Sequence, residues 1–154
     1  MSDFHALKIS EIKQVTPTSV AVTFEVPQAL KTIFSFIAGQ YITLNHTING
    51  ELVRRAYSIC SAPSSGLLTV GIKKVTDGTF SVYANEQLAV GDTIDVMPPQ
   101  GTFTLNPNSQ EAHHIAAFAA GSGITPILSI AQTALEQQSN STFLLVYGNQ
   151  TKQE

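Results

Sequence analysis

The sequence predicts a mainly β protein: a six-stranded antiparallel barrel with a capping helix, followed by a partial α/β unit. Three observations support this prediction. Short runs of alternating apolar residues, separated by turn residues, fill the chain up to residue 105. The Asn49-Gly50 pair between two of these runs is a strong signal for a tight hairpin. After residue 114 the order becomes apolar strand, glycine turn, periodic helix and second apolar strand, which is a βαβ pattern.

The first expected strand, residues 6–15, changes phase along its length. Leu7 and Ile9 lie on one face of an ideal strand, whereas Ile12 and Val15 fall out of phase with them. A strand that keeps all four side chains on the core side needs a bulge or a bend. We therefore expect an irregularity within this strand.

The next two strands are more regular. Residues 18–26 alternate cleanly, and Pro27 ends the run because proline cannot donate to a ladder. Residues 28–39 give no clear pattern. The third strand is expected at residues 40–48, directly before the hairpin turn, so the fourth strand follows at 51–60.

The fourth strand carries the only two arginines of the chain, Arg54 and Arg55. Alternation places Arg55 and Tyr57 on one face and Arg54 and Ser58 on the other, so only one arginine can easily face a ligand. A guanidinium beside a flat aromatic ring suits the phosphate of a nucleotide or flavin. The alternative is an exposed strand with two solvated charges.

A fifth strand at 67–75 is followed by a glycine turn and a helical pattern that runs to residue 88. Gly78 at the start of this helix, with hydroxyl residues in its first turn, leaves backbone N–H groups free to bind phosphate. The alternative is ordinary N-capping by Thr79 or Ser81. A sixth strand is expected at 93–97.

Residues 106–114 are polar and read as a linker between two units. His113 and His114 could ligate a metal ion, but no second cysteine or acidic cluster lies nearby in the sequence, which favours a solvated linker. We therefore expect no metal site.

The glycine turn of the α/β unit joins an apolar strand at 115–120 to a helix. Thr125 could cap this helix, and Pro126 would suit its first position. A second apolar strand follows at 142–147. The Gly-x-Gly turn lacks a third glycine, and no acidic residue ends the second strand, so the turn could serve packing alone.

Composition excludes several classes of function. The net charge is −3 with no basic stripe, which argues against nucleic acid as a partner. No apolar run reaches the span of a bilayer and no secretory signal begins the chain, so we expect no membrane association and a cytoplasmic location. The single cysteine, Cys60, cannot form an internal disulfide or hold an iron–sulfur cluster.

Four motifs in order resemble those of the ferredoxin-NADP reductase superfamily, and within it the reductase components of phenylacetyl-CoA epoxidase and related multicomponent oxygenases. The similarity runs from residue 4 to the end of the chain. It implies an FAD-binding barrel at 1–107 and the start of an NAD(P)-binding domain at 108–154. The motifs are Arg55-Ala56-Tyr57-Ser58, Gly78-Thr79-Phe80-Ser81, Ala120-Gly121-Ser122-Gly123-Ile124-Thr125-Pro126 and Tyr147-Gly148-Asn149.

The resemblance also implies roles for individual residues. Arg55 would hold the FAD diphosphate, Tyr57 would stack on the isoalloxazine ring and Ser58 would hydrogen-bond near the flavin N5, which makes Tyr57 and Ser58 the candidate catalytic residues. Thr125 would be the nicotinamide-site residue closest to the flavin. The implied cofactor-binding set is Arg55, Ala56, Tyr57, Ser58, the backbone of Ile72 and Lys73, Gly78, Thr79, Phe80, Ser81, Gly121, Ser122, Gly123, Ile124, Thr125 and Pro126.

The function implied is an FAD-dependent oxidoreductase that passes electrons from NAD(P)H to an iron–sulfur centre or an oxygenase partner, as in phenylacetate catabolism. The alternatives are a flavin or flavodoxin reductase and a flavin-binding barrel without catalysis. Members of the family have a longer nucleotide-binding sheet, so the chain is expected to be truncated, with any [2Fe-2S] cluster in a missing domain or a partner. We then expect weak NAD(P)H binding, and either low stability of residues 115–150 or a homo-oligomer formed through the incomplete sheet.

Overall fold

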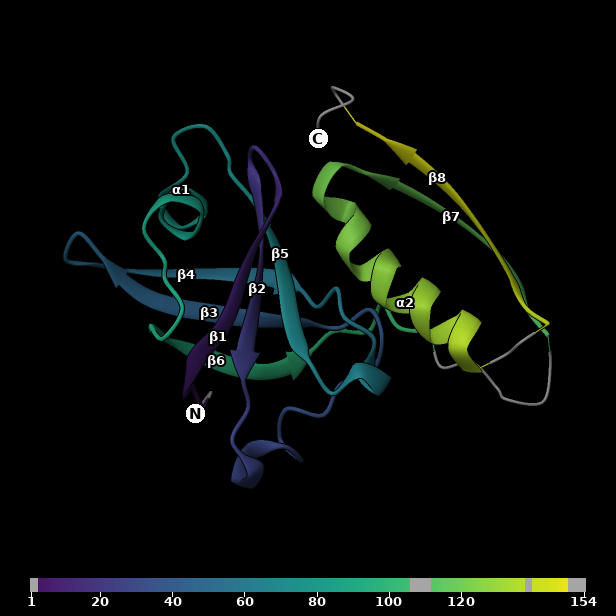
Figure 1. Cartoon of the computed structure of the whole chain (residues 1–154), viewed down its shortest axis with the longest axis horizontal. Coiled ribbons are helices and arrows are strands. Elements are labelled where there is room, and N and C mark those ends of the chain that lie inside the picture. Colours follow the sequence, from purple (N-terminus) through teal and green to yellow (C-terminus); the bar gives the residue numbers. More distant parts are fainter. Residues whose placement is uncertain (1–2, 106–111, 138–139, 150–154) are drawn as a thin grey trace.

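The structure is a computed structural model that describes residues 3–105, 112–137 and 140–149. It contains a β-barrel and a smaller α/β unit, and helix α2, Ile124–Gln137, lies between the barrel and the two strands of the smaller unit (Figure 1). This is the fold class that the sequence predicts. Most of the expected linker, 106–111, falls outside the described residues.

The barrel is built from six strands in the order β4-β3-β6-β1-β2-β5, and every neighbouring pair is antiparallel. A bridge between Ile59, just beyond β4, and Val70 of β5 brings the two outer strands together and closes the barrel. The predicted six-stranded antiparallel barrel is confirmed, with strand ends that differ by a few residues. The strands are β1 His5–Thr16, β2 Ser19–Glu25, β3 Tyr41–Ile48, β4 Glu51–Ser58, β5 Leu68–Lys73 and β6 Thr93–Gln100.

Strand β1 contains the irregularity expected from its change of phase. Its pairing with β2 shifts register between Ile9 and Glu11 and again between Gln14 and Thr16. Leu7 and Ile9 are buried before the first shift, whereas Val15 is exposed. The expected irregularity is therefore confirmed, and it does not bring Val15 into the core.

The hairpin between β3 and β4 turns at Asn49 and Gly50, as the sequence predicts. Both residues have positive φ, 51° and 82°, which matches the twist of a two-residue hairpin. The turn sets an unbroken register along both strands, in which Leu44 pairs with Arg55 and Asn45 pairs with Arg54.

Strand β6 is longer than predicted, because it continues through Pro98 and Pro99 instead of ending at Met97. Its pairing with β3 shifts register over this segment, from Thr43 opposite Met97 to Tyr41 opposite Gln100. Prolines are tolerated where a ladder is interrupted in this way, since no donor is needed there.

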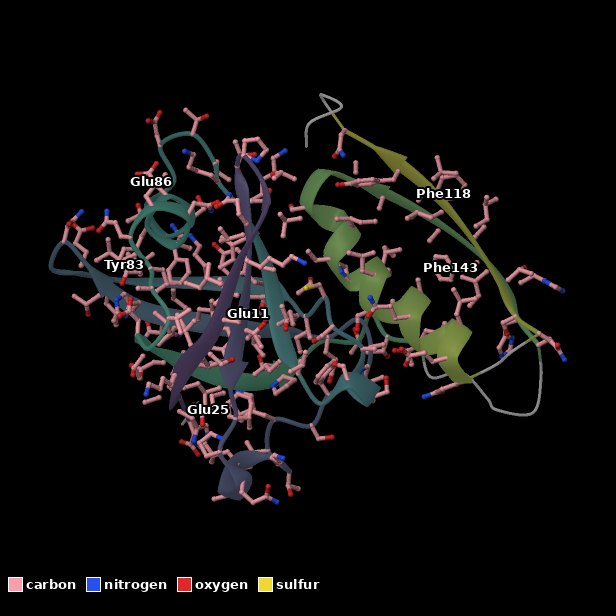
Figure 2. All side chains as sticks on the ribbon, in the orientation of Figure 1. Glu11, Glu25, Tyr83, Glu86, Phe118 and Phe143 are labelled. Atoms are coloured by element: carbon pink, nitrogen blue, oxygen red, sulfur yellow. The ribbon has the colours of Figure 1, made fainter. Side chains whose placement is uncertain are left out.

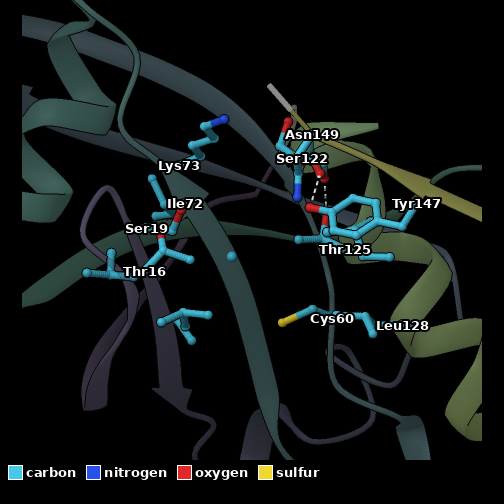
Figure 3. A pocket seen from close by; sticks show the side chains of 16 residues that line it. Thr16, Ser19, Cys60, Ile72, Lys73, Ser122, Thr125, Leu128, Tyr147 and Asn149 are labelled. Carbon is cyan, nitrogen blue, oxygen red and sulfur yellow. Dashed lines mark hydrogen bonds between the residues drawn. The ribbon is translucent and has the colours of Figure 1, made fainter. Parts of the chain in front are cut away.

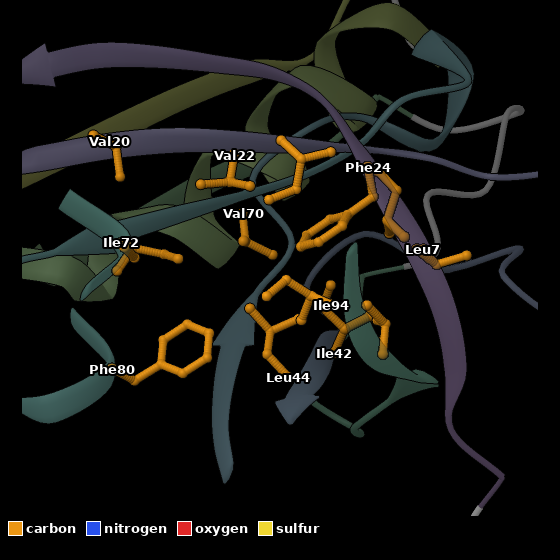
Figure 4. Close-up of a cluster of buried hydrophobic side chains, with 14 of the residues drawn as sticks. Leu7, Val20, Val22, Phe24, Ile42, Leu44, Val70, Ile72, Phe80 and Ile94 are labelled. Carbon is orange, nitrogen blue, oxygen red and sulfur yellow. The ribbon is translucent and has the colours of Figure 1, made fainter. Parts of the chain in front are cut away.

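Buried apolar side chains fill the inside of the barrel, and one face of helix α1, Thr79–Glu86, packs against them (Figure 4). Phe80 and Ala84 of α1 are buried against the strands, so the helix caps the barrel. Two short 3-10 turns, Gln28–Leu30 and Pro63–Ser65, connect strands. The buried members of the cluster are Leu7, Ile9, Val20, Val22, Phe24, Phe34, Ile42, Leu44, Ile48, Val53, Ile59, Leu68, Val70, Ile72, Phe80, Ala84, Ile94 and Val96.

The α/β unit is the predicted βαβ unit. Strand β7, His114–Ala120, leads through a 3-10 turn at Gly121–Gly123 into α2, Ile124–Gln137, and then to the parallel strand β8, Thr142–Gly148. Helix α2 covers one face of the two strands. Figure 2 shows Phe143 on the side of α2 and Phe118 on the opposite side, where its side chain is 75% exposed.

Across the described ranges of the chain, no helix is both long enough and apolar enough to cross a membrane.

Candidate functional site

A cleft of about 460 Å³ opens where β4, β5 and the start of α1 meet the glycine turn of the α/β unit. The two units both contribute to its walls, although most of the lining comes from the barrel. Its lining residues are Arg55, Ala56, Tyr57, Ser58, Gly71, Lys73, Val75, Gly78, Thr79, Phe80, Ser81, Ser122 and Thr125.

The two arginines of β4 separate as the alternation of the strand requires. Arg55 lines the cleft, and its guanidinium donates to the carbonyl of Arg54 at 2.7 Å. The Arg54 guanidinium lies outside the cleft, 4.8 Å from the centre of the Phe4 ring. Phe4 therefore gives Arg54 a structural contact, and Arg55 is the arginine placed to meet a ligand.

The N-terminus of α1 faces the cleft without a side-chain cap. Gly78 is the N-cap residue, and no side chain accepts a hydrogen bond from the first turn. The capping alternative is thus wrong for Thr79 and Ser81, because the Ser81 hydroxyl accepts the N–H of Val75 at 3.1 Å instead. A Cβ at Gly78 would lie 2.5 Å from that hydroxyl, so glycine is needed for this turn.

Tyr57 supplies a flat, half-buried ring at the cleft wall. Its ring centre lies 5.7 Å from that of Phe80 in the first turn of α1. Burial raises the pKa of Tyr57 to about 12, and the nearby positive charge of Arg55 opposes this increase. The hydroxyl is protonated at neutral pH, as in any tyrosine, and can donate a hydrogen bond.

The α/β unit reaches the cleft through Ser122 and Thr125. Helix α2 already begins at Ile124, so the prediction that Thr125 caps it and Pro126 takes its first position is wrong. The 3-10 turn continues directly into α2, and the Thr125 hydroxyl donates to the carbonyl of Ser122 at 3.0 Å.

A second cavity, of about 290 Å³, also lies between the barrel and the α/β unit. The β1–β2 hairpin, β5 and the glycine turn with α2 and β8 line it (Figure 3). Cys60 and Leu128 lie at one end of it, and Tyr147 and Asn149 lie near the glycine turn. The Tyr147 hydroxyl donates to the carbonyl of Gly121 at 2.9 Å, which ties β8 to the turn.

Most of the residues expected to bind a cofactor meet at the cleft, but not all of them. Ile72 is buried in the barrel and lines the second cavity, and its carbonyl accepts a hydrogen bond from the Asn85 amide at 3.2 Å. Gly121 and Ile124 also line the second cavity, whereas Gly123 and Pro126 line neither space.

Two lining residues were missed by the sequence analysis, Gly71 and Val75. Gly71 could have been found, because an isolated glycine within a strand pattern often marks a close approach of another segment. Val75 gave no such signal, since a single apolar residue after a strand is ordinary.

The charges at the cleft favour an anionic ligand. Arg55 and Lys73 are cationic, and the described residues that line the cleft include no carboxylate. An uncapped helix N-terminus adds partial positive charge on the same side. Together with the Tyr57 ring, this arrangement fits a ligand that combines phosphate with a flat aromatic group.

No group of three or more potential metal ligands occurs among the residues that the structure describes. The His114 Nδ1 atom instead lies 2.8 Å from the Thr142 hydroxyl, where it helps to pair the starts of β7 and β8.

Two family models match separate parts of the chain. Residues 6–105 match the oxidoreductase FAD-binding domain family, and residues 118–154 match the oxidoreductase NAD-binding domain family.

Similar curated proteins include a 1,2-phenylacetyl-CoA epoxidase subunit from Escherichia coli, which is 42% identical over 99% of this chain and 43% of its own length. The ferredoxin reductase component of 3-ketosteroid-9-alpha-monooxygenase from Rhodococcus rhodochrous is 36% identical over 93% of this chain and 40% of its own length. The chain thus spans about two fifths of these relatives.

Among solved structures, phthalate dioxygenase reductase is 26% identical with a TM-score of 0.78, covering 97% of this chain and 45% of its own. A ferredoxin NADP+ reductase from Neisseria gonorrhoeae, solved with bound FAD and NADP, is 26% identical with a TM-score of 0.76. That match covers 96% of this chain and 58% of the other.

Proposed function

The chain belongs to the oxidoreductase FAD-binding domain family, and we propose that it binds FAD in the cleft at Arg55 and takes part in electron transfer from NAD(P)H. One observation carries this proposal: the only arginine that faces the cleft, the uncapped N-terminus of α1 and the Tyr57 ring all line the same space. An FAD molecule needs all three, because it combines a diphosphate with a flat ring system.

The residues would divide the binding of FAD between them. The Arg55 guanidinium and the N–H groups at the start of α1, from Gly78 to Ser81, would hold the diphosphate through charge-assisted hydrogen bonds. Tyr57 would cover one face of the flat ring, and the Ser58 hydroxyl would hydrogen-bond to its edge. Both stand as the candidate catalytic residues.

When bound, FAD supplies hydride acceptance and one-electron transfer. The protein's part is to orient the reactants and to exclude water. A tyrosine is already protonated at neutral pH, and burial raises the pKa of Tyr57 further, from 10.0 to about 12, so it adds no negative charge beside an anionic ligand. Ser122 and Thr125 would hold the nicotinamide side of NAD(P)H, with Thr125 nearest to the flavin.

The electron acceptor we propose is an iron–sulfur centre or an oxygenase component. The names of two relatives support this, since one belongs to an epoxidase and the other is a ferredoxin reductase component. We further propose that residues 1–107 and 108–154 are the two functional domains. The apolar outer face of β7 and β8 would allow two copies of the chain to associate, which size-exclusion chromatography with light scattering can measure.

The proposal is tested by titrating the purified chain with FAD and following flavin fluorescence. Arg55→Ala should lose about 1.5–3 kcal/mol of binding free energy, or about 10–150-fold in Kd, because a charge-assisted contact disappears. Arg54→Ala is the matched control and should change the Kd little, since Arg54 contacts Phe4 outside the cleft.

The second step adds NADH or NADPH to the FAD-loaded protein without oxygen and follows the loss of flavin absorbance. Loss of absorbance supports the reductase proposal. Equal losses of affinity in Arg54→Ala and Arg55→Ala would contradict the assigned cleft. Because weak NAD(P)H binding is expected, the nucleotide is raised until the rate no longer changes, and FAD binding with no reduction even then would favour a flavin-binding module without catalysis.

A further inference from the structure

Helix α2 is attached to the barrel at three successive places along its length. Thr125 in its first turn approaches Gly71 of β5, Ser129 hydrogen-bonds to Ser61, and Glu136 accepts a hydrogen bond from Ser64. Thr125 and Ser129 are four residues apart and therefore lie on the same face of the helix. One face of α2 is thus fixed against the segment that follows β4 and against β5.

The contact at Gly71 depends on the absence of a side chain. A Cβ at this position would lie 2.8 Å from the Cγ2 atom of Thr125, which is closer than such atoms come in folded proteins. The backbone of Gly71 carries no positive φ, so a turn conformation does not explain the glycine. Glycine at this position lets Thr125 lie directly on β5, at the boundary between the cleft and the second cavity.

The contact at Ser129 joins the two units through a buried hydrogen bond. The Ser129 hydroxyl donates to the carbonyl of Ser61 at 2.7 Å, and the Ser129 side chain is 0% exposed. Ser61 lies in the segment that follows β4. Strand β4 carries the Arg55 and Tyr57 that line the cleft. The hydrogen bond therefore connects the helix that carries Thr125 to the segment that follows this strand of the cleft wall.

We propose that Gly71 and Ser129 are positioning residues: they hold Thr125 and Ser122 at the rim of the cleft, at a fixed place relative to Arg55 and Tyr57. The inference rests on the proposed function for its consequence, because the place of Thr125 then sets where a nicotinamide meets the flavin. The fixed attachment of α2 to the barrel is a property of the chain itself, with or without a cofactor.

The test measures the distance between spin labels on the two units by pulsed electron paramagnetic resonance. Cysteines at exposed Lys13 of β1 and Gln132 of α2 carry the labels, in a Cys60→Ser background that keeps a donor toward the Thr69 carbonyl. This parent protein should give one narrow distance distribution. Gly71→Ala and Ser129→Ala should each lose the narrow peak, by displacement or by broadening.

A second-site change separates positioning from general destabilisation. Thr125→Ser removes the Cγ2 atom that a Cβ at Gly71 would meet and keeps the hydroxyl that donates to Ser122. Adding it to Gly71→Ala should restore the narrow distribution. The matched control is Ser10→Ala, which removes a serine-to-carbonyl hydrogen bond within the barrel and should leave the distribution unchanged.

A narrow, unshifted distribution in both Gly71→Ala and Ser129→Ala would overturn the inference, and so would a failure of Thr125→Ser to restore it. Should Gly71→Ala not fold, Ser129→Ala still decides. FAD titration of Ser129→Ala is the second readout, and its Kd should match that of the parent protein because Ser129 lies outside the cleft. A parent protein that shows the narrow peak yet takes up no FAD would contradict the proposed function only.

Discussion

The barrel and the α/β unit bury their apolar residues to very different extents. Leu44 of β3 is 1% exposed, whereas Leu144 of β8 is 62% exposed, although both are leucines within strands. Four of the six barrel strands pair with a strand on each side. The two outer strands, β4 and β5, are brought together by the bridge between Ile59 and Val70, which closes the barrel. Strands β7 and β8 pair only with each other among the described residues, and α2 covers one of their two faces.

This difference shows where the stability of the described structure comes from. Hydrophobic burial grows with the apolar area removed from water, and the barrel has a continuous core that removes most of it. In the smaller unit, burial is found mainly on α2. This helix contacts β7 and β8 on one side and the barrel on the other (Figure 1). We therefore expect the α/β unit to depend on the barrel for its own order.

The largest expected effect comes from shortening one leucine in each region. Leu44→Ala should cost about 2–5 kcal/mol of unfolding free energy, because it leaves a cavity in a closed core. In a monomeric chain, where Leu144 stays exposed, Leu144→Ala should change the unfolding free energy by less than about 0.5 kcal/mol. Urea unfolding followed by circular dichroism measures both. A large loss in Leu144→Ala would show that the outer face of the sheet is covered in solution, as in an oligomer.

A smaller difference in unfolding free energy is expected between alanine substitutions at two glycines, Gly50 and Gly148. Gly50 has a φ of 82° in the β3–β4 turn, so Gly50→Ala should cost about 1–2 kcal/mol in the same unfolding experiment. A Cβ added at Gly148, at the end of β8, would meet no atom within 4 Å, and Gly148 has no positive φ. Gly148→Ala is the matched control and should be close to neutral. A neutral Gly50→Ala would mean that the hairpin turn does not limit the stability of the barrel.

The pH dependence of the unfolding free energy should reflect the burial of the Tyr57 hydroxyl in the barrel. Burial raises the pKa of Tyr57 from 10.0 to about 12, so the folded protein holds this proton more tightly than the unfolded chain does. The stabilisation is fully present below pH 10 and is lost as the pH rises from 10 to about 12. Tyr57→Phe should lose less stability over this interval. Identical pH profiles for the two proteins would contradict the burial of the hydroxyl.

The smallest effect is expected at Cys60, on the boundary between the two regions. Burial raises the pKa of this thiol, and its Sγ atom donates to the Thr69 carbonyl at 3.4 Å. Because the thiolate is the reactive form, Cys60 should react with Ellman's reagent more slowly than free glutathione at pH 8. Ser129→Ala should speed the reaction by loosening α2. Reaction as fast as that of glutathione in the unaltered chain would show that the two regions separate readily.

Local patterns in the sequence predicted the fold well, because each depends on residues close together in the chain. Alternation of apolar residues predicted the strands, the phase change in β1 predicted its register shifts, and Asn49-Gly50 predicted the hairpin. The predicted length of β6 was wrong, because two consecutive prolines, Pro98 and Pro99, usually indicate the end of a strand. Only the register shift against β3 shows that they can remain within it.

At the candidate site, the sequence by itself determined that Arg55 and Tyr57 share one face of β4, because a strand alternates its side chains with a period of two. It could not determine what lies opposite them. Ser129 and Ser61 are 68 residues apart, and their hydrogen bond exists only once the barrel has closed and α2 has packed against it. The same holds for Thr125 on Gly71, since no local pattern records which segment will lie over a glycine. The tertiary structure alone decided this arrangement, because contacts between distant segments follow from how whole elements pack.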